Sequence, residues 1–497
     1  MATTLSRGLV SDSWSPHAPA TAAAVPATGA AGLIGALGRG LPDGRLVIDP
    51  DVLAAISHDE AEWAPVGRAA AGVRARTEAE VRHVVRTCAE FRAPVVPRGA
   101  GTGLSGGANA ADGSVVLDLS GMNQVLEIDR DNMTCVVQPG VVNNDLKAAV
   151  AEHGLWYPPD PASAPWSTIG GNVATNAGGL CCLKYGVTRD YVLGLRVVTG
   201  AVPGTADGEA VGYGDAVRLG RRTSKGVAGL DLTGLFVGSE GTLGVVTEVT
   251  LRLRPALTGT PRTVVGAFGD LVSAGEAVAL ITRRGLSPSV LELLDRACLT
   301  AVEEWKHLGL EADAAALLLA RVDTPGSSGE EEADALAAAM SDAGALWAAQ
   351  STDDTEAEAL FEARRLAYPA LERLGPVLTE DVCVPRSAVP AMLARIEAIA
   401  ARHGVTIATV AHAGDGNLHP LLITPPGDEE ARLAAQAAFT EFLDAAIELG
   451  GTVSGEHGIG LLKRDGMRRE LDPGALAMQE AVRRALDPLG IFNPGKG

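Results

Sequence analysis

The order of hydrophobic and polar positions predicts single helices alternating with short strands in the first half of the chain. Thr77-Glu78-Ala79-Glu80 forms a capping box, and the helix that it opens places Val81, Val84, Val85 and Cys88 on one face. A second helix is expected over 143–153. Apolar or alternating runs predict strands over 94–97, 115–119, 134–138, 193–199 and 243–253.

The pattern changes near residue 257. From Thr263 onward the sequence favours longer helices rich in Ala, Leu and Glu, with an exposed turn over 324–329. The acidic stretches 330–334 and 353–358 are typical of solvated helix faces. Residues 1–40 are rich in Ala, Pro, Thr and Gly and are predicted to be mostly a disordered tail. We therefore expect two organised domains after this tail, with their boundary near residue 257.

Length, charge and cysteine usage exclude several classes of protein. A chain of 497 residues is long enough for two or three domains. Its 41 Lys and Arg against 61 Asp and Glu give a net charge of −20, so neither nucleic acid nor anionic lipid is an expected partner. No apolar run approaches the ~20 residues of a membrane span, and no secretory signal is evident. The six cysteines form no C-x-x-C pair, which indicates reduced thiols in a cytoplasmic protein rather than disulfides or an iron–sulfur cluster.

A glycine-rich loop follows the strand predicted over 94–97. Residues 98–107 hold five glycines in ten positions, and Gly101-x-Gly103-x-x-Gly106 matches the dinucleotide fingerprint in form. That fingerprint requires a helix directly after the loop, whereas turn residues and a strand follow here. A Rossmann domain is therefore rejected. The loop can still present several backbone N–H groups to a diphosphate.

Further clusters of Gly, Asn and Ser carry a family resemblance. They lie at 168–172, 174–179, 184–190 and 238–244, after Pro158-Pro159-Asp160-Pro161. In this order they resemble the FAD domain of the vanillyl-alcohol oxidase / p-cresol methylhydroxylase superfamily. Within it the chain is most similar to the group of FAD-linked D-lactate dehydrogenases, glycolate oxidase subunits and D-2-hydroxyglutarate dehydrogenases, over residues ~45 to 497.

The resemblance implies an α+β fold in two main parts. It places an FAD-binding domain of the p-cresol methylhydroxylase type, with two α/β subdomains, at 41–256. An α+β substrate domain, or cap, is expected at 257–480, and a C-terminal segment at 481–497 is expected to pack back on the FAD domain. The cofactor-binding residues that the resemblance implies are Arg98, Gly99, Gly101, Thr102, Gly103, Ser105, Gly106, Pro159, Asp160, Thr168, Gly170, Gly171, Asn172, Thr175, Arg189, Asp190, Glu240, Gly241 and Asn493.

We expect the FAD to be bound without a covalent link. Covalent members of the superfamily use a His or Cys, the His often in this first loop, and no His lies between Arg98 and Asn109. Cys181 and Cys182 leave the covalent alternative open, although packing explains them more simply.

Histidines gather in the last fifth of the chain. Three of the nine histidines occur in His412-x6-His419 and Ser454-Gly455-Glu456-His457, among glycines that allow close approach. Two imidazoles and a carboxylate suit a divalent metal ion with open positions. The resemblance assigns His412, His419 and Glu456 as metal ligands and His457 as the catalytic base. Zinc is the expected metal, and Mn²⁺ or Fe²⁺ fits the same donors.

Three further positions bear on the substrate. Arg364 aligns with the arginine that binds the substrate carboxylate in the family, and Arg365 beside it is the rival. Thr379 stands where the hydroxyglutarate enzymes carry a lysine, and Leu421 replaces a polar residue. A distal carboxylate would lose its hydration there without gaining a cation, so D-lactate or glycolate is favoured over a dicarboxylate.

The resulting hypothesis is FAD- and metal-dependent oxidation of a D-2-hydroxy acid to the 2-oxo acid, with hydride transfer to flavin N5. The alternatives are a glycolate oxidase-type flavin subunit of a complex, or a D-2-hydroxyglutarate dehydrogenase. A metal-dependent hydrolase would leave the Gly and Asn clusters unused, and the complete histidine set argues against a non-catalytic flavin subunit. Electrons are expected to pass to a separate acceptor: an electron-transfer protein, an iron–sulfur subunit, a quinone or oxygen. That acceptor could bring the protein to a membrane, and a homodimer stays open.

Overall fold

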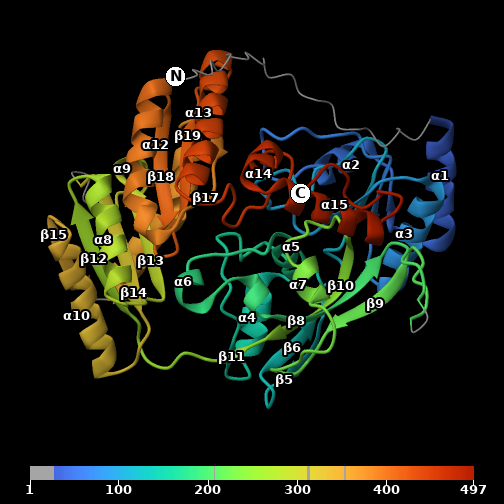
Figure 1. The fold of residues 1–497 in the computed structure, drawn as a ribbon, viewed down its shortest axis with the longest axis horizontal. Helices are drawn as coiled ribbons and strands as arrows, with labels where there is room; N and C mark the ends of the chain where they lie inside the picture. The colour runs from blue at the N-terminus through green and yellow to red at the C-terminus, as the bar shows by residue number, and fades with distance from the viewer. Residues whose placement is uncertain (1–26, 206–207, 311–313, 352–353) are drawn as a thin grey trace, which may run out of the picture.

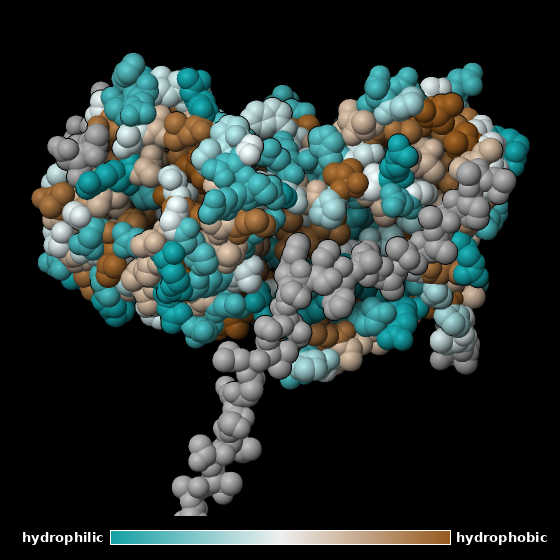
Figure 2. Space-filling view, turned by 90° about the horizontal axis from the view of Figure 1, so that it is seen from above, coloured by the Kyte–Doolittle hydropathy of each residue, from teal (hydrophilic) through white to brown (hydrophobic). Residues whose placement is uncertain are grey.

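The computed structural model describes residues 27–205, 208–310, 314–351 and 354–497. Two domains lie side by side, an N-terminal domain in blue to green and a cap domain in yellow to orange (Figure 1). Helices and strands alternate through both, which confirms the predicted mixed α+β class. On the face shown in Figure 2, hydrophilic and hydrophobic residues are intermixed. In the described part of the chain, no helix combines the length and the hydropathy that a membrane span requires.

A four-stranded sheet begins the N-terminal domain. Its order is β1-β2-β4-β3, with β2 and β3 parallel to β4 and β1 antiparallel to β2. Helix α3 starts as predicted, since the Thr77 side chain accepts a hydrogen bond from the Glu80 N–H. These elements are α1 (Ala27–Gly40), β1 (Leu46–Val47), α2 (Pro50–Ile56), β2 (Ala71–Arg74), α3 (Glu78–Phe91), β3 (Val95–Arg98) and β4 (Val115–Asp118).

A second, antiparallel sheet completes this domain in the order β5-β6-β10-β8-β9. Its strands are β5 (Val125–Asp129), β6 (Thr134–Val137), β8 (Val192–Thr199), β9 (Asp215–Gly220) and β10 (Gly244–Arg252). Around it lie α4 (Asn143–Ala151), β7 (Leu155–Trp156), α5 (Ile169–Thr175), α6 (Cys182–Tyr185), α7 (Leu232–Phe236) and β11 (Arg254–Pro255). The strands predicted over 134–138, 193–199 and 243–253 are therefore present to within a residue or two.

The cap domain is built on one large sheet in the order β15-β12-β14-β13-β18-β19-β16, with β17 also paired to β19. One face packs on α8, α10, α12 and α13, and the other on α9 and α11. The strands are β12 (Arg262–Phe268), β13 (Val290–Asp295), β14 (Ala316–Val322), β15 (Trp347–Ser351), β16 (Val377–Thr379), β17 (Val382–Cys383), β18 (Thr406–His412) and β19 (Asn417–Ile423). The helices are α8 (Leu271–Arg283), α9 (Arg296–Lys306), α10 (Ser327–Asp342), α11 (Asp354–Glu372), α12 (Val389–His403) and α13 (Glu429–Glu448).

The end of the chain leaves the cap and lies against the N-terminal domain. Helices α14 (Arg464–Glu470) and α15 (Pro473–Leu486), in red, lie over the blue and green elements (Figure 1). Beyond them, Phe492 is buried in the core of the first sheet, and the Asn493 N–H donates to the Val95 carbonyl. This return connects the last residues to the strand that precedes the glycine-rich loop.

Two local differences from the sequence predictions concern helices. Residues 27–40 form α1 in place of the disordered chain expected there, because Leu33 and Leu37 are fully buried against the first sheet. Their spacing of four places both on one helix face. Residues 1–26 of the expected tail lie outside the described residues. Helix α10 also begins at Ser327, inside the expected turn.

Candidate active site

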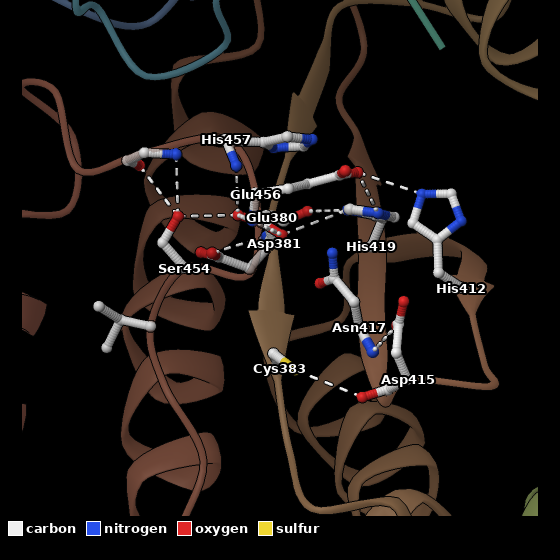
Figure 3. Close-up of polar contacts among 12 residues, drawn as sticks. Glu380, Asp381, Cys383, His412, Asp415, Asn417, His419, Ser454, Glu456 and His457 are labelled. Atoms are coloured by element: carbon white, nitrogen blue, oxygen red, sulfur yellow. Dashed lines mark hydrogen bonds and ion pairs between the residues drawn. The ribbon is translucent and has the colours of Figure 1, made fainter. Parts of the chain in front are cut away.

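Two histidines and a glutamate converge at one end of the cap sheet (Figure 3). His412 ends β18, and His419 lies in β19. The register pairs Val410 with His419, so both histidines share one face of the β18–β19 hairpin. Glu456 comes from the loop between α13 and α14, and its Oε1 lies 3.1 Å from His412 Nε2 and 3.4 Å from His419 Nε2. One nitrogen or oxygen from each residue lies within 4.8 Å of the other two.

The histidines and carboxylates of this cluster stabilise one another's charged forms. Burial alone would raise the pKa of Glu456, but His412 and His419 outweigh it and hold that pKa well below its usual range. Burial would lower the pKa of His412, but Glu292 and Glu456 raise it well above its usual range. The two histidines are buried, Glu456 is half-buried, and the three groups point at one another. Their donor chemistry therefore fits a divalent metal ion, as the sequence predicts.

His457 stands beside this cluster with a free nitrogen. Its ring stacks on that of His419, with centroids 4.9 Å apart and an interplanar angle of 16°. Its Nδ1 is buried and has no hydrogen-bond partner among the described residues. Burial lowers the pKa of His457 to about 4, so the ring is neutral near pH 7 and able to accept a proton.

A buried aspartate holds the loop that carries Glu456 and His457. The Asp381 carboxylate accepts the backbone N–H groups of Glu456 at 3.1 Å and His457 at 2.9 Å, and the Ser454 hydroxyl at 2.9 Å. Lys463 lies next to this aspartate, with Nζ 2.7 Å from Glu380 Oε1 and 3.5 Å from Asp381 Oδ2. Sequence analysis missed Asp381 as a site residue. Its signal was a pair of adjacent carboxylates inside the otherwise apolar segment 377–384.

The N-terminal domain also contacts this loop. Glu240, predicted to line the cofactor, accepts the N–H groups of Ile459 at 2.7 Å and Gly460 at 2.8 Å with its two carboxylate oxygens. Ser105, from the glycine-rich loop, donates its hydroxyl to the His457 carbonyl at 3.1 Å. Gly460 has φ +49°, and a Cβ there would stand 2.1 Å from the Ser105 carbonyl oxygen. Two residues predicted to bind the cofactor, Ser105 and Glu240, thus also hold the loop that carries His457.

The two main cofactor segments predicted from sequence face each other. A Cβ on Gly99 would stand 2.2 Å from Thr168 Oγ1, so the glycine-rich loop touches the start of α5. Gly101 and Gly106 both have positive φ, at +80° and +82°. Positive φ angles favour glycine, and loops of this conformation can present backbone N–H groups to a phosphate. The structure brings Gly99 of the loop against Thr168 and Gly171 at the start of α5. The cofactor roles of Arg98, Gly101, Thr102, Gly103, Ser105, Gly106, Gly170, Asn172 and Thr175 stay predictions.

The remaining predicted cofactor residues make contacts within the protein. Arg189 donates to the carbonyls of Gly234 and Val237, and the Asp190 carboxylate accepts the Val187 N–H. Asp160 is bound by the N–H and thiol of Cys181. Asn493 Nδ2 donates to the carbonyls of Gly107 and Glu240. The cofactor roles of these residues, and of Pro159 and Gly241, stay predictions.

The two candidate arginines on α11 differ in exposure and in ion-pair partners. Arg364 is 11% exposed, and its Nε donates to Glu292 Oε2 at 2.7 Å in the cap sheet. Arg365 is 48% exposed and pairs with Glu358 and Glu362 on its own helix. Arg364 is therefore the arginine that faces the histidine cluster. Thr379 pairs in register with Leu421.

Comparison with known proteins identifies close relatives. Residues 69–203 match the model of an "FAD binding domain", and residues 260–497 match "FAD linked oxidases, C-terminal domain". Glycolate oxidase subunit GlcD of Bacillus subtilis (strain 168) is 42% identical over 85% of this chain and 87% of its own. The D-lactate dehydrogenase of Anaerostipes hadrus is 35% identical over 91% of this chain and 94% of its own.

Solved structures share the fold. p-Cresol methylhydroxylase with substrate bound superimposes with a TM-score of 0.77 over 95% of this chain and 97% of its own, at 17% sequence identity. The 4-ethylphenol oxidase of Gulosibacter chungangensis gives a TM-score of 0.74 at 20% identity, over 95% of this chain and 97% of its own. These matches confirm the p-cresol methylhydroxylase-type fold that the glycine and asparagine clusters predict.

The contact of Glu240 with Ile459 and Gly460, in the loop that carries His457, predicts a loss of stability in Glu240→Gln. A glutamine has one acceptor oxygen, so its amide NH₂ would face a buried N–H of Ile459 or Gly460 at a cost of about 1–3 kcal/mol. The urea midpoint of unfolding, followed by circular dichroism, should fall accordingly. The control is Glu397→Gln on the exposed face of α12, which should unfold like the wild type. Equal urea midpoints for the two variants would contradict the expected contribution of the Glu240 contact to stability.

Proposed function

The chain belongs to the family of FAD-linked oxidases, and we propose that it oxidises a short D-2-hydroxy acid, D-lactate or glycolate, to the 2-oxo acid. The observation that carries this proposal is the convergence of His412, His419 and Glu456 beside the neutral ring of His457. The names of the relatives, glycolate oxidase subunit and D-lactate dehydrogenase, support a hydroxy acid as substrate.

The oxidation removes a proton from the hydroxyl group and a hydride from Cα, and each task has a group suited to it. His457 accepts the hydroxyl proton, because its ring is neutral near pH 7 and its Nδ1 is unpartnered. His412, His419 and Glu456 would hold a divalent metal, which lowers the pKa of a hydroxyl that it binds. FAD, bound without a covalent link, supplies N5 as the hydride acceptor. Arg364 binds the substrate carboxylate.

The arrangement of the cap favours a short substrate. Leu421 is buried and lies beside Thr379 across β16 and β19. Neither side chain offers a cation, so the second carboxylate of D-2-hydroxyglutarate would be desolvated without a partner. A D-2-hydroxyglutarate dehydrogenase is for this reason the weaker alternative.

A second candidate is a flavin subunit that works only within a complex. The word subunit in the name of the Bacillus relative favours it. In either case the electrons pass to a separate acceptor, which by chemistry is an electron-transfer protein, an iron–sulfur subunit, a quinone or oxygen. We place the protein in the cytoplasm, with zinc as the first metal to test and Mn²⁺ or Fe²⁺ after it.

Anaerobic bleaching of the flavin tests the proposal. We expect the absorbance of the purified yellow protein near ~450 nm to fall with D-lactate or glycolate, and to fall little with L-lactate or D-2-hydroxyglutarate. Treatment with a chelator should abolish bleaching, and added Zn²⁺ should restore it. If the yellow protein is bleached by none of the four acids, the proposed substrate class is wrong. Bleaching without steady turnover by an artificial acceptor would favour the subunit alternative.

The base assignment predicts a specific defect in His457→Ala. The variant should keep its FAD absorbance, while the anaerobic rate of flavin reduction by the hydroxy acid falls about 10²- to 10⁴-fold. Stopped-flow absorbance measures this rate at saturating substrate. A wild-type rate in the variant would remove His457 from the proposed chemistry.

Arg364→Ala and Arg365→Ala form a matched pair of neighbours on α11. Loss of the carboxylate-binding group in Arg364→Ala should raise KM at least 10-fold, as expected for a charge-assisted hydrogen bond worth about 1.5–3 kcal/mol. Arg365→Ala removes pairs on an exposed helix face and should leave KM unchanged. Steady-state kinetics of the two variants decide the role, and the reverse pattern would transfer it to Arg365.

A further inference from the structure

A buried glutamate joins the two halves of the proposed substrate site. Glu292 lies in the middle of β13 and has no exposed side-chain surface. Its Oε1 lies 2.7 Å from His412 Nδ1, and its Oε2 accepts a hydrogen bond from Arg364 Nε at 2.7 Å. One carboxylate therefore contacts both a proposed metal ligand and the proposed carboxylate-binding arginine.

The cap sheet explains how these three residues meet. β13 pairs with β18, Leu293 opposite Ala411, so Glu292 and His412 are neighbours on adjacent strands. Leu291 and Leu293 face the layer of α8, α10, α12 and α13, whereas Val290 and Leu294 face α9 and α11. Glu292 alternates with Leu291 and Leu293 and so points toward α11, which carries Arg364. The pairing of β13 with β18 therefore fixes the positions at which Glu292 contacts His412 and Arg364.

We propose that Glu292 is a positioning residue that sets the spacing between Arg364 and the metal ion held through His412. The inference rests on the proposed function, because it assigns Glu292 a role at that same site. A 2-hydroxy acid carries its hydroxyl and carboxylate on adjacent carbons. The two protein groups that bind them must therefore stand at one fixed separation, and a shared buried carboxylate provides it.

The contact with His412 also selects the nitrogen that faces Glu456. A carboxylate at Nδ1 requires a proton on that nitrogen, which leaves the Nε2 lone pair for a metal ion. His412 Nε2 is the nitrogen that lies 3.1 Å from Glu456 Oε1. Glu292 thereby orients the ring and its tautomer toward the cluster.

The contact with Arg364 orients the guanidinium in the same way. Its Nε is occupied by Glu292, and among the described residues neither terminal nitrogen has a hydrogen-bond partner. The two terminal nitrogens are the pair available for a substrate carboxylate.

The decisive variant is Glu292→Gln in the FAD-loaded protein. The amide keeps the size of the side chain but loses the charge that holds both partners. We expect the affinity for Zn²⁺, measured by competition with a chromophoric chelator, to fall about 10- to 100-fold. At saturating Zn²⁺, KM for D-lactate should still be raised severalfold, because Arg364 is no longer fixed. The FAD content per chain should stay at the wild-type value.

The matched control is Asp295→Asn, three residues further along the same strand. Asp295 is also buried, but its carboxylate accepts the N–H groups of Cys298 and Thr409 and supports only the fold. Its variant should melt at a lower temperature with Zn²⁺ affinity and KM unchanged. If Glu292→Gln does not fold, Glu292→Asp retains the charge on a side chain too short to contact both partners, and should show the same losses.

The outcomes separate this inference from the proposed function. Wild-type Zn²⁺ affinity and KM in a folded Glu292 variant would overturn the positioning role alone. Equal losses in Asp295→Asn would also overturn it, because they would show a general effect of altering β13. If the wild-type protein itself binds no Zn²⁺ and its flavin is reduced by no hydroxy acid, the proposed function fails and the role of Glu292 fails with it.

Discussion

The site depends on buried carboxylates that accept backbone N–H groups from one loop. Asp381 holds the N–H groups of Glu456 and His457, and Glu240 holds those of Ile459 and Gly460. An ionised carboxylate is costly to bury, and the N–H donors, with Lys463 beside Asp381, offset part of that cost. A loop without regular hydrogen bonding thereby acquires a fixed backbone. The proposed ligand and the proposed base owe their positions to it.

The two anchors of this loop come from different domains. Asp381 belongs to the cap, whereas Glu240 and Ser105 belong to the N-terminal domain and are themselves predicted to bind the flavin. Any displacement of the cap relative to the N-terminal domain would therefore strain the loop. This arrangement places His457, the proposed base, at the junction of the two domains, where the proposed cofactor and substrate would have to meet.

Motifs with short spacing could be read from the sequence, and contacts across the fold could not. The helix at Thr77, the strands near 134, 193 and 243, and the clustering of three histidines follow from local patterns. The pairing of Glu292 with His412 joins residues 120 positions apart, so no local pattern contains it. A charged residue within the apolar run 290–294 was the available signal, since a buried charge requires a partner. The segment that forms α1 is rich in Ala and Gly, and this composition led to the prediction of disorder. The spacing of Leu33 and Leu37, which fits one buried helix face, was the signal for a helix.

The charge balance of the site argues for a cation as part of its working state. Glu292, Glu456 and Asp381 lie around two histidines, and all three carboxylates have a pKa lowered against the effect of burial. Arg364 pairs with Glu292, and Lys463 lies between Asp381 and Glu380, so neither cation reaches the space between His412, His419 and Glu456. Without a metal ion, a proton on His412 supplies that charge. A divalent cation would replace this proton and add a second positive charge, which suits the hydroxyl and carboxylate oxygens of the proposed substrate.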